Sequence, residues 1–272
     1  MKRNILITAI AILCLALVSC SIHVDGETFG GKTIKGNDTI VTQNFEVTDF
    51  NEISISLAAT VNFTVSNEYT CSVRVDENLL EYLDIEVKGH DLILKKQDDH
   101  KNVNLRATEF VIDVTAPSLE DINLAGSGTF NLLSPLEVEK LEVNVAGSGD
   151  VYLKETITVD DIELNVAGSG DIACEELIAE KLDANVAGSG DLKVVGGMVR
   201  EAEADVAGSG DIVLYCDIEN LEANIAGSGD IKARVNGRLT YGIYGSGDIG
   251  YYGNPVVEDD KAGVSRVKRL GD

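Results

Sequence analysis

Residues 141–154 read LEVNVAGSGDVYLK, and this stretch decides the fold. Apolar and polar side chains alternate on both sides of a Gly-Ser-Gly tripeptide, which is the period-two pattern of strands with one buried face. The two glycines allow a sharp bend without a Cβ clash. The stretch therefore predicts two short strands joined by a tight turn, with Val143 and Val151 among the residues that face inward.

The same pattern is repeated along the chain. Gly-Ser-Gly occurs seven times at intervals of 18 to 21 residues, beginning at Gly126, Gly147, Gly168, Gly188, Gly208, Gly227 and Gly245. A third short strand with Ile157 and Val159 precedes the next copy, so each repeat holds three strands and three bends. This arithmetic predicts an all-β fold, a single-stranded parallel β-helix with about 20 residues per coil and coils ~4.8 Å apart. An antiparallel meander also alternates, but stacking of identical turns favours the β-helix.

Composition changes divide the chain into four parts. We predict a lipoprotein signal peptide at 1–19, a lipidated Cys20 with a flexible tether at 20–44, a β-helix domain at 45–252, and a C-terminal cap or tail at 253–272. Within the β-helix, 45–120 lacks the tripeptide and is expected to form irregular coils that cap one end. The Gly-Ser-Gly-Asp ladder occupies 121–250.

The N-terminus resembles a bacterial lipoprotein signal. Lys2 and Arg3 precede an apolar run of 14 residues, too short for a stable membrane span. The run ends in Leu17-Val18-Ser19-Cys20, which resembles a lipobox, in which the Cys is diacylated and becomes the first residue. We predict that the lipid on Cys20 anchors the protein to a membrane. The alternative is an ordinary secretory signal that contains a Cys.

The net charge of −24 excludes a nucleic-acid binder that depends on phosphate contacts. Aromatic residues make up 5% and Trp is absent, which argues against a glycan cleft lined by stacking rings. Three cysteines, Cys71, Cys174 and Cys216, remain after the signal region and lack metal-site spacing, so we expect small core residues.

Six of the seven tripeptides are followed by an aspartate. These are Asp150, Asp171, Asp191, Asp211, Asp230 and Asp248. Stacked carboxylates ~4.8 Å apart repel by roughly 0.9 kcal/mol per pair even in a water-like dielectric. A ladder of weak calcium sites would offset this repulsion and is one hypothesis. We favour solvated, turn-capping aspartates, and predict no firm metal site and no cofactor.

Two further side-chain sets recur in position. One equivalent site holds Asn123, Asn144, Asn165, Asn185, Asp205 and Asn224. Stacked amides can hydrogen-bond along the axis, which favours a structural role. Five tyrosines lie towards the C-terminal end, and Tyr251 and Tyr252 are a candidate ligand platform for sugars. A hydrophobic end cap is the interpretation that we favour for the tyrosines.

Three features resemble a known family: Phe50-Asn51-Glu52-Ile53, the step Val114-Thr115-Ala116-Pro117-Ser118-Leu119, and the Gly-Ser-Gly-Asp ladder. Together they resemble the head GIN domain, an auto-transporter adhesin family of Bacteroidetes lipoproteins. The resemblance covers about residues 45–250. It implies a right-handed parallel β-helix on a lipoprotein or secreted chain, and it brings no catalytic residues.

These features favour a non-enzymatic lipoprotein of the outer membrane, displayed on the surface as a binding or adhesion module. Its partners would be the membrane, through the lipid on Cys20, and a host or cell-surface glycan or protein. A periplasmic structural or stress-linked envelope protein is the alternative. A polysaccharide-acting enzyme is less favoured because residues 121–250 hold 24 acids and 8 bases, a field that repels acidic glycans.

Overall fold

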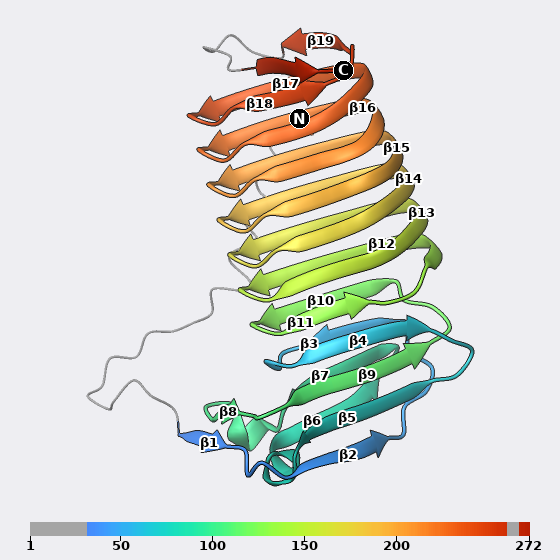
Figure 1. Ribbon diagram of the computed structural model, residues 1–272, viewed down its shortest axis with the longest axis vertical. Helices are drawn as coiled ribbons and strands as arrows, with labels where there is room; N and C mark the ends of the chain where they lie inside the picture. Colours follow the sequence, from blue (N-terminus) through green and yellow to red (C-terminus); the bar gives the residue numbers. More distant parts are fainter. Residues whose placement is uncertain (1–31, 260–266) are drawn as a thin grey trace.

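The computed structural model describes residues 32–259 and 267–272. The chain forms an all-β solenoid of about seven turns, in which parallel pairs join residues about 20 positions apart. Figure 1 shows the coils stacked along one long axis. The predicted β-helix is therefore confirmed, and the antiparallel meander is excluded for the ladder. The predicted signal peptide and Cys20 lie outside the described residues.

The regular coils are formed by β10 to β18. Their bounds are β10 (Asp121–Gly126), β11 (Thr129–Leu132), β12 (Leu136–Gly147), β13 (Asp150–Gly168), β14 (Ile172–Gly188), β15 (Leu192–Gly208), β16 (Ile212–Gly227), β17 (Ile231–Gly245) and β18 (Ile249–Tyr252). Long strands bend at corners where two consecutive residues are exposed, as at 154–155 and 160–161 in β13. Each coil thus has the three short faces that the repeat predicts.

Alternate apolar side chains fill the interior of the solenoid. The predicted inward residues around one coil, Leu141, Val143, Val145, Val151, Leu153, Ile157 and Val159, are at most 5% exposed. The register places like residues above one another, because Val145 pairs with Val166 and Val166 pairs with Val186. Cys71, Cys174 and Cys216 are free and buried, and burial raises the pKa of each thiol to about 12. The core role predicted for these cysteines is confirmed.

The N-terminal end is closed by strands of mixed direction. Their bounds are β1 (Thr33–Lys35), β2 (Ile40–Phe45), β3 (Glu52–Ile55), β4 (Thr60–Val65), β5 (Thr70–Asp76), β6 (Leu83–Lys88), β7 (Asp91–Lys96), β8 (Asn104–Arg106) and β9 (Phe110–Ala116), with 3₁₀ helices η1 (Glu77–Tyr82) and η2 (Asp98–His100). β3 and β4 lie directly on β10 and β11 as one further coil. β7 and β9 continue the parallel stack, whereas β2, β5 and β6 pair antiparallel.

Two expectations for this end need correction. The tether predicted at 20–44 is too long, because β1 pairs with β8 and β2 pairs with β5. The segment 45–120 is not made only of irregular coils, since antiparallel strands cover the last parallel layer. The pairings of these strands join residues far apart in the chain, such as Ile40 with Asp76. No local sequence pattern reveals such a pairing.

At the other end, β19 (Val256–Asp259) and β20 (Val267–Gly271) pair with β17 and β18. These strands lie in the segment that was expected to be a cap or tail. Within residues 32–259 and 267–272, no helix is both long and apolar enough to cross a membrane.

Candidate functional site

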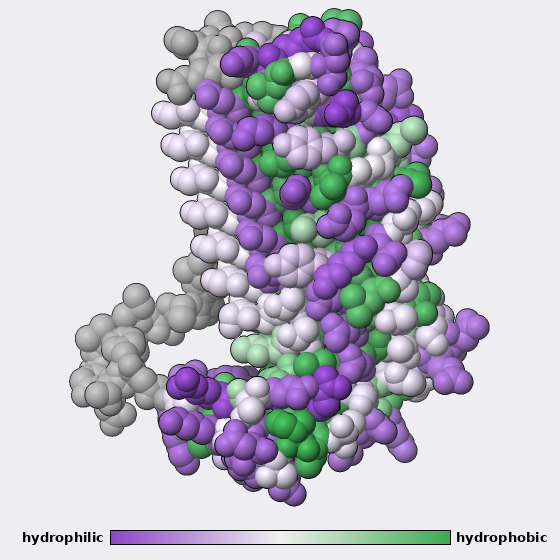
Figure 2. All heavy atoms as spheres, viewed as in Figure 1, coloured by the Kyte–Doolittle hydropathy of each residue, from purple (hydrophilic) through white to green (hydrophobic). Residues whose placement is uncertain are grey.

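The repeated turns form continuous files along one edge of the solenoid. Figure 2 shows this edge as a band of near-neutral residues beside a hydrophilic band, where the Gly-Ser-Gly turns lie in Figure 1. From the second tripeptide on, each Ser hydrogen-bonds through its N–H to a glycine carbonyl of the coil before it, as Ser169 does to Gly147 at 2.8 Å. The turns are therefore held by backbone contacts, and their serine side chains face solvent.

The fold brings the six predicted aspartates together in one file. The backbone N–H of each later Asp donates to Oδ1 of the Asp in the coil before it, at N···O distances of 2.8 to 3.1 Å. These hydrogen bonds agree with the turn-capping role that the sequence favoured. Among the described residues, no group of three or more His, Cys, Asp or Glu is arranged to hold a metal ion. Calcium binding by this file stays an untested hypothesis.

The asparagine file forms the amide ladder that the repeat predicts. Nδ2 of Asn144 donates to Asn123, Asn165 donates to Asn144, and Asn185 donates to Asn165, each at 3.0 Å. Asp205 has no amide donor, so the ladder is interrupted there, and it resumes where Asn224 donates to Asp205.

A second acidic file, which we call the acid file, runs beside the amide ladder. Register pairs place Asp121, Glu142, Glu163, Asp183, Glu203 and Glu222 in consecutive coils. Burial, and then the neighbouring carboxylates, raise the pKa of Asp121 to about 6 and that of Glu203 to about 7. Carboxylates of the file also accept amide protons, as Glu163 does from Asn165 at 3.0 Å.

The structure does not bring the two predicted platform tyrosines together. Tyr251 pairs with buried Ala233 and packs against the core. Tyr252 pairs with Arg234, whose Cζ lies 5.7 Å from the Tyr252 ring centroid. The Tyr252 ring also meets Tyr215 edge-on, with centroids 6.2 Å apart. Adjacent residues of a strand point to opposite faces, so the pair does not form one flat platform.

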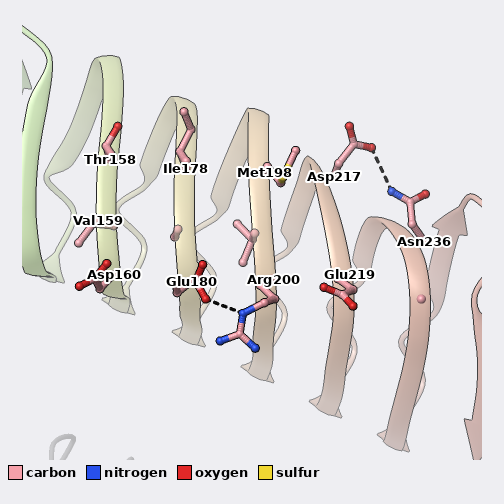
Figure 3. Close-up of a pocket in the computed structure, with 13 residues that line it drawn as sticks. Thr158, Val159, Asp160, Ile178, Glu180, Met198, Arg200, Asp217, Glu219 and Asn236 are labelled. Carbon is pink, nitrogen blue, oxygen red and sulfur yellow. Dashed lines mark hydrogen bonds and ion pairs between the residues drawn. The ribbon is translucent and has the colours of Figure 1, made fainter.

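A hollow that was not predicted lies on an outer face of the ladder. This axial groove crosses β13 to β17 between residues 158 and 237 and has a volume of about 810 Å³. Figure 3 shows two files of outward side chains along it. One file holds Thr158, Ile178, Met198, Asp217 and Asn236, and the other holds Asp160, Glu180, Arg200 and Glu219.

The centre of the axial groove is apolar and open to solvent. Met198 is 65% exposed and Ile178 is 44% exposed, although both are large hydrophobic residues. They are register partners in adjacent coils, so their side chains form one patch. Below them, Ala179 and Val199 belong to the buried core, which gives the patch a packed floor.

Acidic residues dominate the rim of the axial groove. Four carboxylates line it and Arg200 is the one basic residue among its described lining residues. Arg200 is already engaged, since its Nε lies 2.5 Å from Glu180 and its NH1 lies 3.5 Å from Glu201. Asp217 accepts a hydrogen bond from Asn236 at 3.4 Å. Asp217 also lies 3.9 Å from Nε of Arg234. Asp160 and Glu219 are the lining carboxylates without an ion pair to another described residue, so the rim keeps a net negative charge beside an apolar centre. This combination suits binding of a cationic, partly apolar ligand.

A signal for this groove was present in the sequence. Leu177, Ile178 and Ala179 are three apolar residues in succession, so strict alternation fails and one of them must face outward. Sequence reasoning missed this consequence because an outward Ile is indistinguishable from a core residue until the register is known.

Several proteins of known structure resemble this chain. A "putative lipid binding protein" from Parabacteroides distasonis is 33% identical, with a TM-score of 0.83, covering 88% of this chain and 100% of its own. A "putative adhesin" from the same species is 27% identical, with a TM-score of 0.82 and the same coverage. A "putative adhesin" from Parabacteroides merdae is 26% identical, with a TM-score of 0.82, covering 88% of this chain and 99% of its own. Among curated proteins, none matches.

A family match covers most of the ladder and its N-terminal end. The family is described as "Putative auto-transporter adhesin, head GIN domain", and its pattern matches residues 49–156 and 152–255. The two matched segments overlap and together span both the opening coil and the repeated Gly-Ser-Gly-Asp turns. The chain therefore belongs to the head GIN domain family.

Proposed function

We propose that this protein is a non-enzymatic envelope lipoprotein whose solenoid binds a partner through the axial groove. The adhesin description of the family supports a binding role. The lipobox at Leu17-Val18-Ser19-Cys20 supports anchoring by lipid, and the rigid stack supports display of a fixed surface. Cys20 would hold the acyl chains, and β13 to β17 would carry the recognition surface.

One observation carries the binding role: Ile178 and Met198 form an exposed apolar patch on a face that is otherwise polar or acidic. Fully burying one such side chain is worth about 1.5–3 kcal/mol. The patch lies across adjacent coils of a packed stack, so a ligand covers both residues without the protein having to rearrange. This combination favours association with a partner surface.

The charge of the rim points to a basic protein segment as the partner. Five strands at ~4.8 Å spacing give the groove a length of about 19 Å, which matches about six residues of extended peptide. Lysine or arginine side chains would meet the rim carboxylates, and apolar side chains would cover Met198. A glycan fits less well, because the groove lacks aromatic rings among its described lining residues.

One relative is named a "putative lipid binding protein", but a lipid inside the solenoid of this chain is disfavoured. Acyl chains need an apolar cavity, whereas the interior between Phe50 and Ile249 is filled by side chains that are almost fully buried. An enzymatic role is also disfavoured by the chemistry at hand. The cysteine thiols are buried with pKa values raised to about 12, which leaves them protonated and poor nucleophiles.

A peptide that alternates Lys and Leu tests the groove by isothermal titration calorimetry. We expect it to bind, and a peptide that alternates Glu and Leu not to bind. Met198→Gln and Ile178→Thr make the patch polar and should weaken binding by about tenfold together, since apolar burial is lost. Leu133→Gln is the matched control, because Leu133 is 42% exposed and lies outside the groove. Equal affinity in wild type and in the groove variants would contradict the proposal.

The rim makes a second, electrostatic prediction for the same assay. Asp217→Asn and Glu219→Gln should each weaken binding of the Lys-Leu peptide, and more strongly at low salt than at high salt. An affinity that is indifferent to salt would show that the carboxylates do not contribute.

A further inference from the structure

A second hollow lies at the opposite end of the molecule and differs from every acidic surface described above. This basic cleft, about 520 Å³ in volume, is bounded by the turn after β3, the start of β4, the strand β8 and the first Gly-Ser-Gly turn. Figure 1 shows β1 and β8 beside this end of the solenoid. Its charged lining residues are Lys96 and Arg106.

The absence of acid from this lining is unusual for the chain. The protein has 46 acidic residues, yet the described lining of the basic cleft contains no Asp or Glu. The axial groove and the two other hollows at 181–240 and 230–270 are each lined by at least two carboxylates. The positive charges of Lys96 and Arg106 therefore face a cleft without carboxylates.

The two cations are held in different ways. Nζ of Lys96 donates to the carbonyl oxygens of Lys101 and Val103, at 2.9 and 2.8 Å. These acceptors are neutral, so the Lys96 charge is positioned but not neutralised. The neighbouring Lys95 shows the contrast, since it lies within 4 Å of three carboxylates, those of Asp84, Glu86 and Asp98.

Arg106 is the more available of the two cations. It ends β8, where its backbone carbonyl accepts from Gly36 at 2.9 Å and fixes the strand. Within residues 32–259 and 267–272, its guanidinium makes no ion pair or side-chain hydrogen bond. A planar guanidinium of this kind can bind a carboxylate or phosphate through two parallel hydrogen bonds.

The rest of the lining suits a polar molecule that carries the anion. Ser56, Thr60 and Ser127 supply hydroxyl groups, and Asn104 supplies an amide. Phe110 adds an apolar surface beside them. Hydroxyl and amide groups can donate and accept, which matches the hydroxyl groups of a sugar.

We propose that the basic cleft binds a carboxylate or phosphate group carried on a sugar-sized polar molecule, with Arg106 and Lys96 as its cationic ligands. The site is independent of the axial groove, because it lies on different coils and selects the opposite charge. Distant acids do not prevent such binding, since at about 0.15 M salt their field is screened within about 8 Å.

Calorimetry on the full-length protein tests the site with D-galacturonate, glucose 6-phosphate and inorganic phosphate as probes. We expect one or more of them to bind and neutral glucose not to bind. Arg106→Gln should weaken binding by at least about tenfold, the loss of one charge-assisted hydrogen bond. Arg238→Gln is the matched control, since it removes the same charge from an exposed site in the acidic hollow at 181–240.

Lys96→Arg and Lys96→Met complete the test. Lys96→Arg keeps the charge and should retain binding, whereas Lys96→Met should lose it, with circular dichroism showing that both variants fold. Equal affinity in wild type and Arg106→Gln would overturn the proposal, as would equal binding of glucose. Absence of binding to every soluble anion at millimolar concentration, together with absence of Arg106-dependent binding to anionic vesicles, would also overturn it.

Vesicles distinguish a free anion from a lipid headgroup. Cosedimentation with phosphatidylglycerol vesicles that is lost in Arg106→Gln, without binding of the soluble probes, would assign the site to a headgroup phosphate. Cosedimentation that is unchanged in Arg106→Gln would place the lipid contact elsewhere and overturn the assignment to this cleft.

Discussion

At the scale of single residues, the second glycine of each tripeptide is fixed by the coil beneath it. A Cβ on Gly170 would lie 2.0 Å from the carbonyl oxygen of Gly149, and this backbone oxygen cannot move without shifting a whole coil. We expect Gly170→Ala to lower the free energy of unfolding by about 1–3 kcal/mol, as overpacking does. Urea denaturation measures the change.

A glycine in the same solenoid provides the matched control. Gly196 lies at a corner, and a Cβ there would come no closer than 3.5 Å to Glu175, with no left-handed backbone to strain. Gly196→Ala should leave stability unchanged or raise it slightly. A loss in Gly196→Ala as large as that in Gly170→Ala would contradict close stacking of the tripeptides.

Glu203 makes stability depend on pH. Burial raises its pKa to about 7, and so do Asp205 on its own strand and Glu222 and Asp183 on the neighbouring coils, against an opposing effect of Lys181. The folded pKa lies above the unfolded value of about 4.3, so the folded state holds the proton more tightly. The stability tied to this proton is complete below about pH 4 and is lost as the pH rises through about 7.

Glu203→Gln removes this titration. We expect the variant to show a smaller fall in Tm than wild type between about pH 5 and about pH 8. Glu139→Gln, at an exposed corner of β12, should retain the wild-type fall. Identical pH profiles for wild type and Glu203→Gln would show that this carboxyl does not titrate in that range.

At the scale of structural elements, the interrupted amide ladder offers a stabilising substitution. Asp205 is largely buried, burial raises its pKa, and it cannot donate to Oδ1 of Asn185. Asp205→Asn would supply that donor and would still accept from Asn224. We expect the free energy of unfolding to rise by about 1 kcal/mol, the net worth of one hydrogen bond.

The control for this ladder is Asp160→Asn, which makes the same chemical change at an exposed corner. It should leave the urea midpoint nearly unchanged. A lower midpoint for Asp205→Asn than for wild type would refute the ladder as a source of stability at that coil.

The file of aspartates that follow the tripeptides gives a second element-scale prediction. One oxygen of each carboxylate, from Asp150 to Asp230, already accepts the N–H of the next coil. This bond stabilises the turn without a cation, so we expect the same Tm in millimolar calcium and in chelator. A rise in Tm with calcium that Asp191→Asn abolishes would instead support the cation ladder.

Local repetition explains how much of the fold could be predicted. Inward residues such as Val143 and Val151 follow from period-two alternation, and the turns follow from the glycines that bound Ser148. The amide ladder follows from the register alone. The cap at the N-terminal end was expected from the loss of the repeat, but its antiparallel strands β2, β5 and β6 could not be predicted, because their pairings depend on distant partners.

The candidate sites were less predictable than the fold. Tyr251 and Tyr252 were grouped by sequence proximity, although neighbours in a strand face opposite sides. The axial groove depends on whether Ile178 faces in or out, which only the register decides. Arg106 could not be identified from the sequence, because what distinguishes it is the absence of carboxylates from the cleft around it, and this depends on the fold.

At the scale of the whole molecule, the N-terminal cap and the axial groove lie at different levels of the solenoid. The described chain begins at residue 32 beside β8, whereas the axial groove lies on β13 to β17 further along the rod. An anchor at Cys20, as proposed, would precede the N-terminal cap in the chain, and the groove would lie several coils further on. This arrangement suits contact with another molecule outside the membrane.

Protease shaving of intact cells most directly tests the proposal that the protein is displayed on the cell surface. An immunoblot should show that the wild-type protein is digested on intact cells while a periplasmic marker stays whole. Cys20→Ala should leave the membrane fraction, which checks the anchor. Protection of the wild-type protein until the outer membrane is permeabilised would contradict surface display and favour the periplasmic alternative.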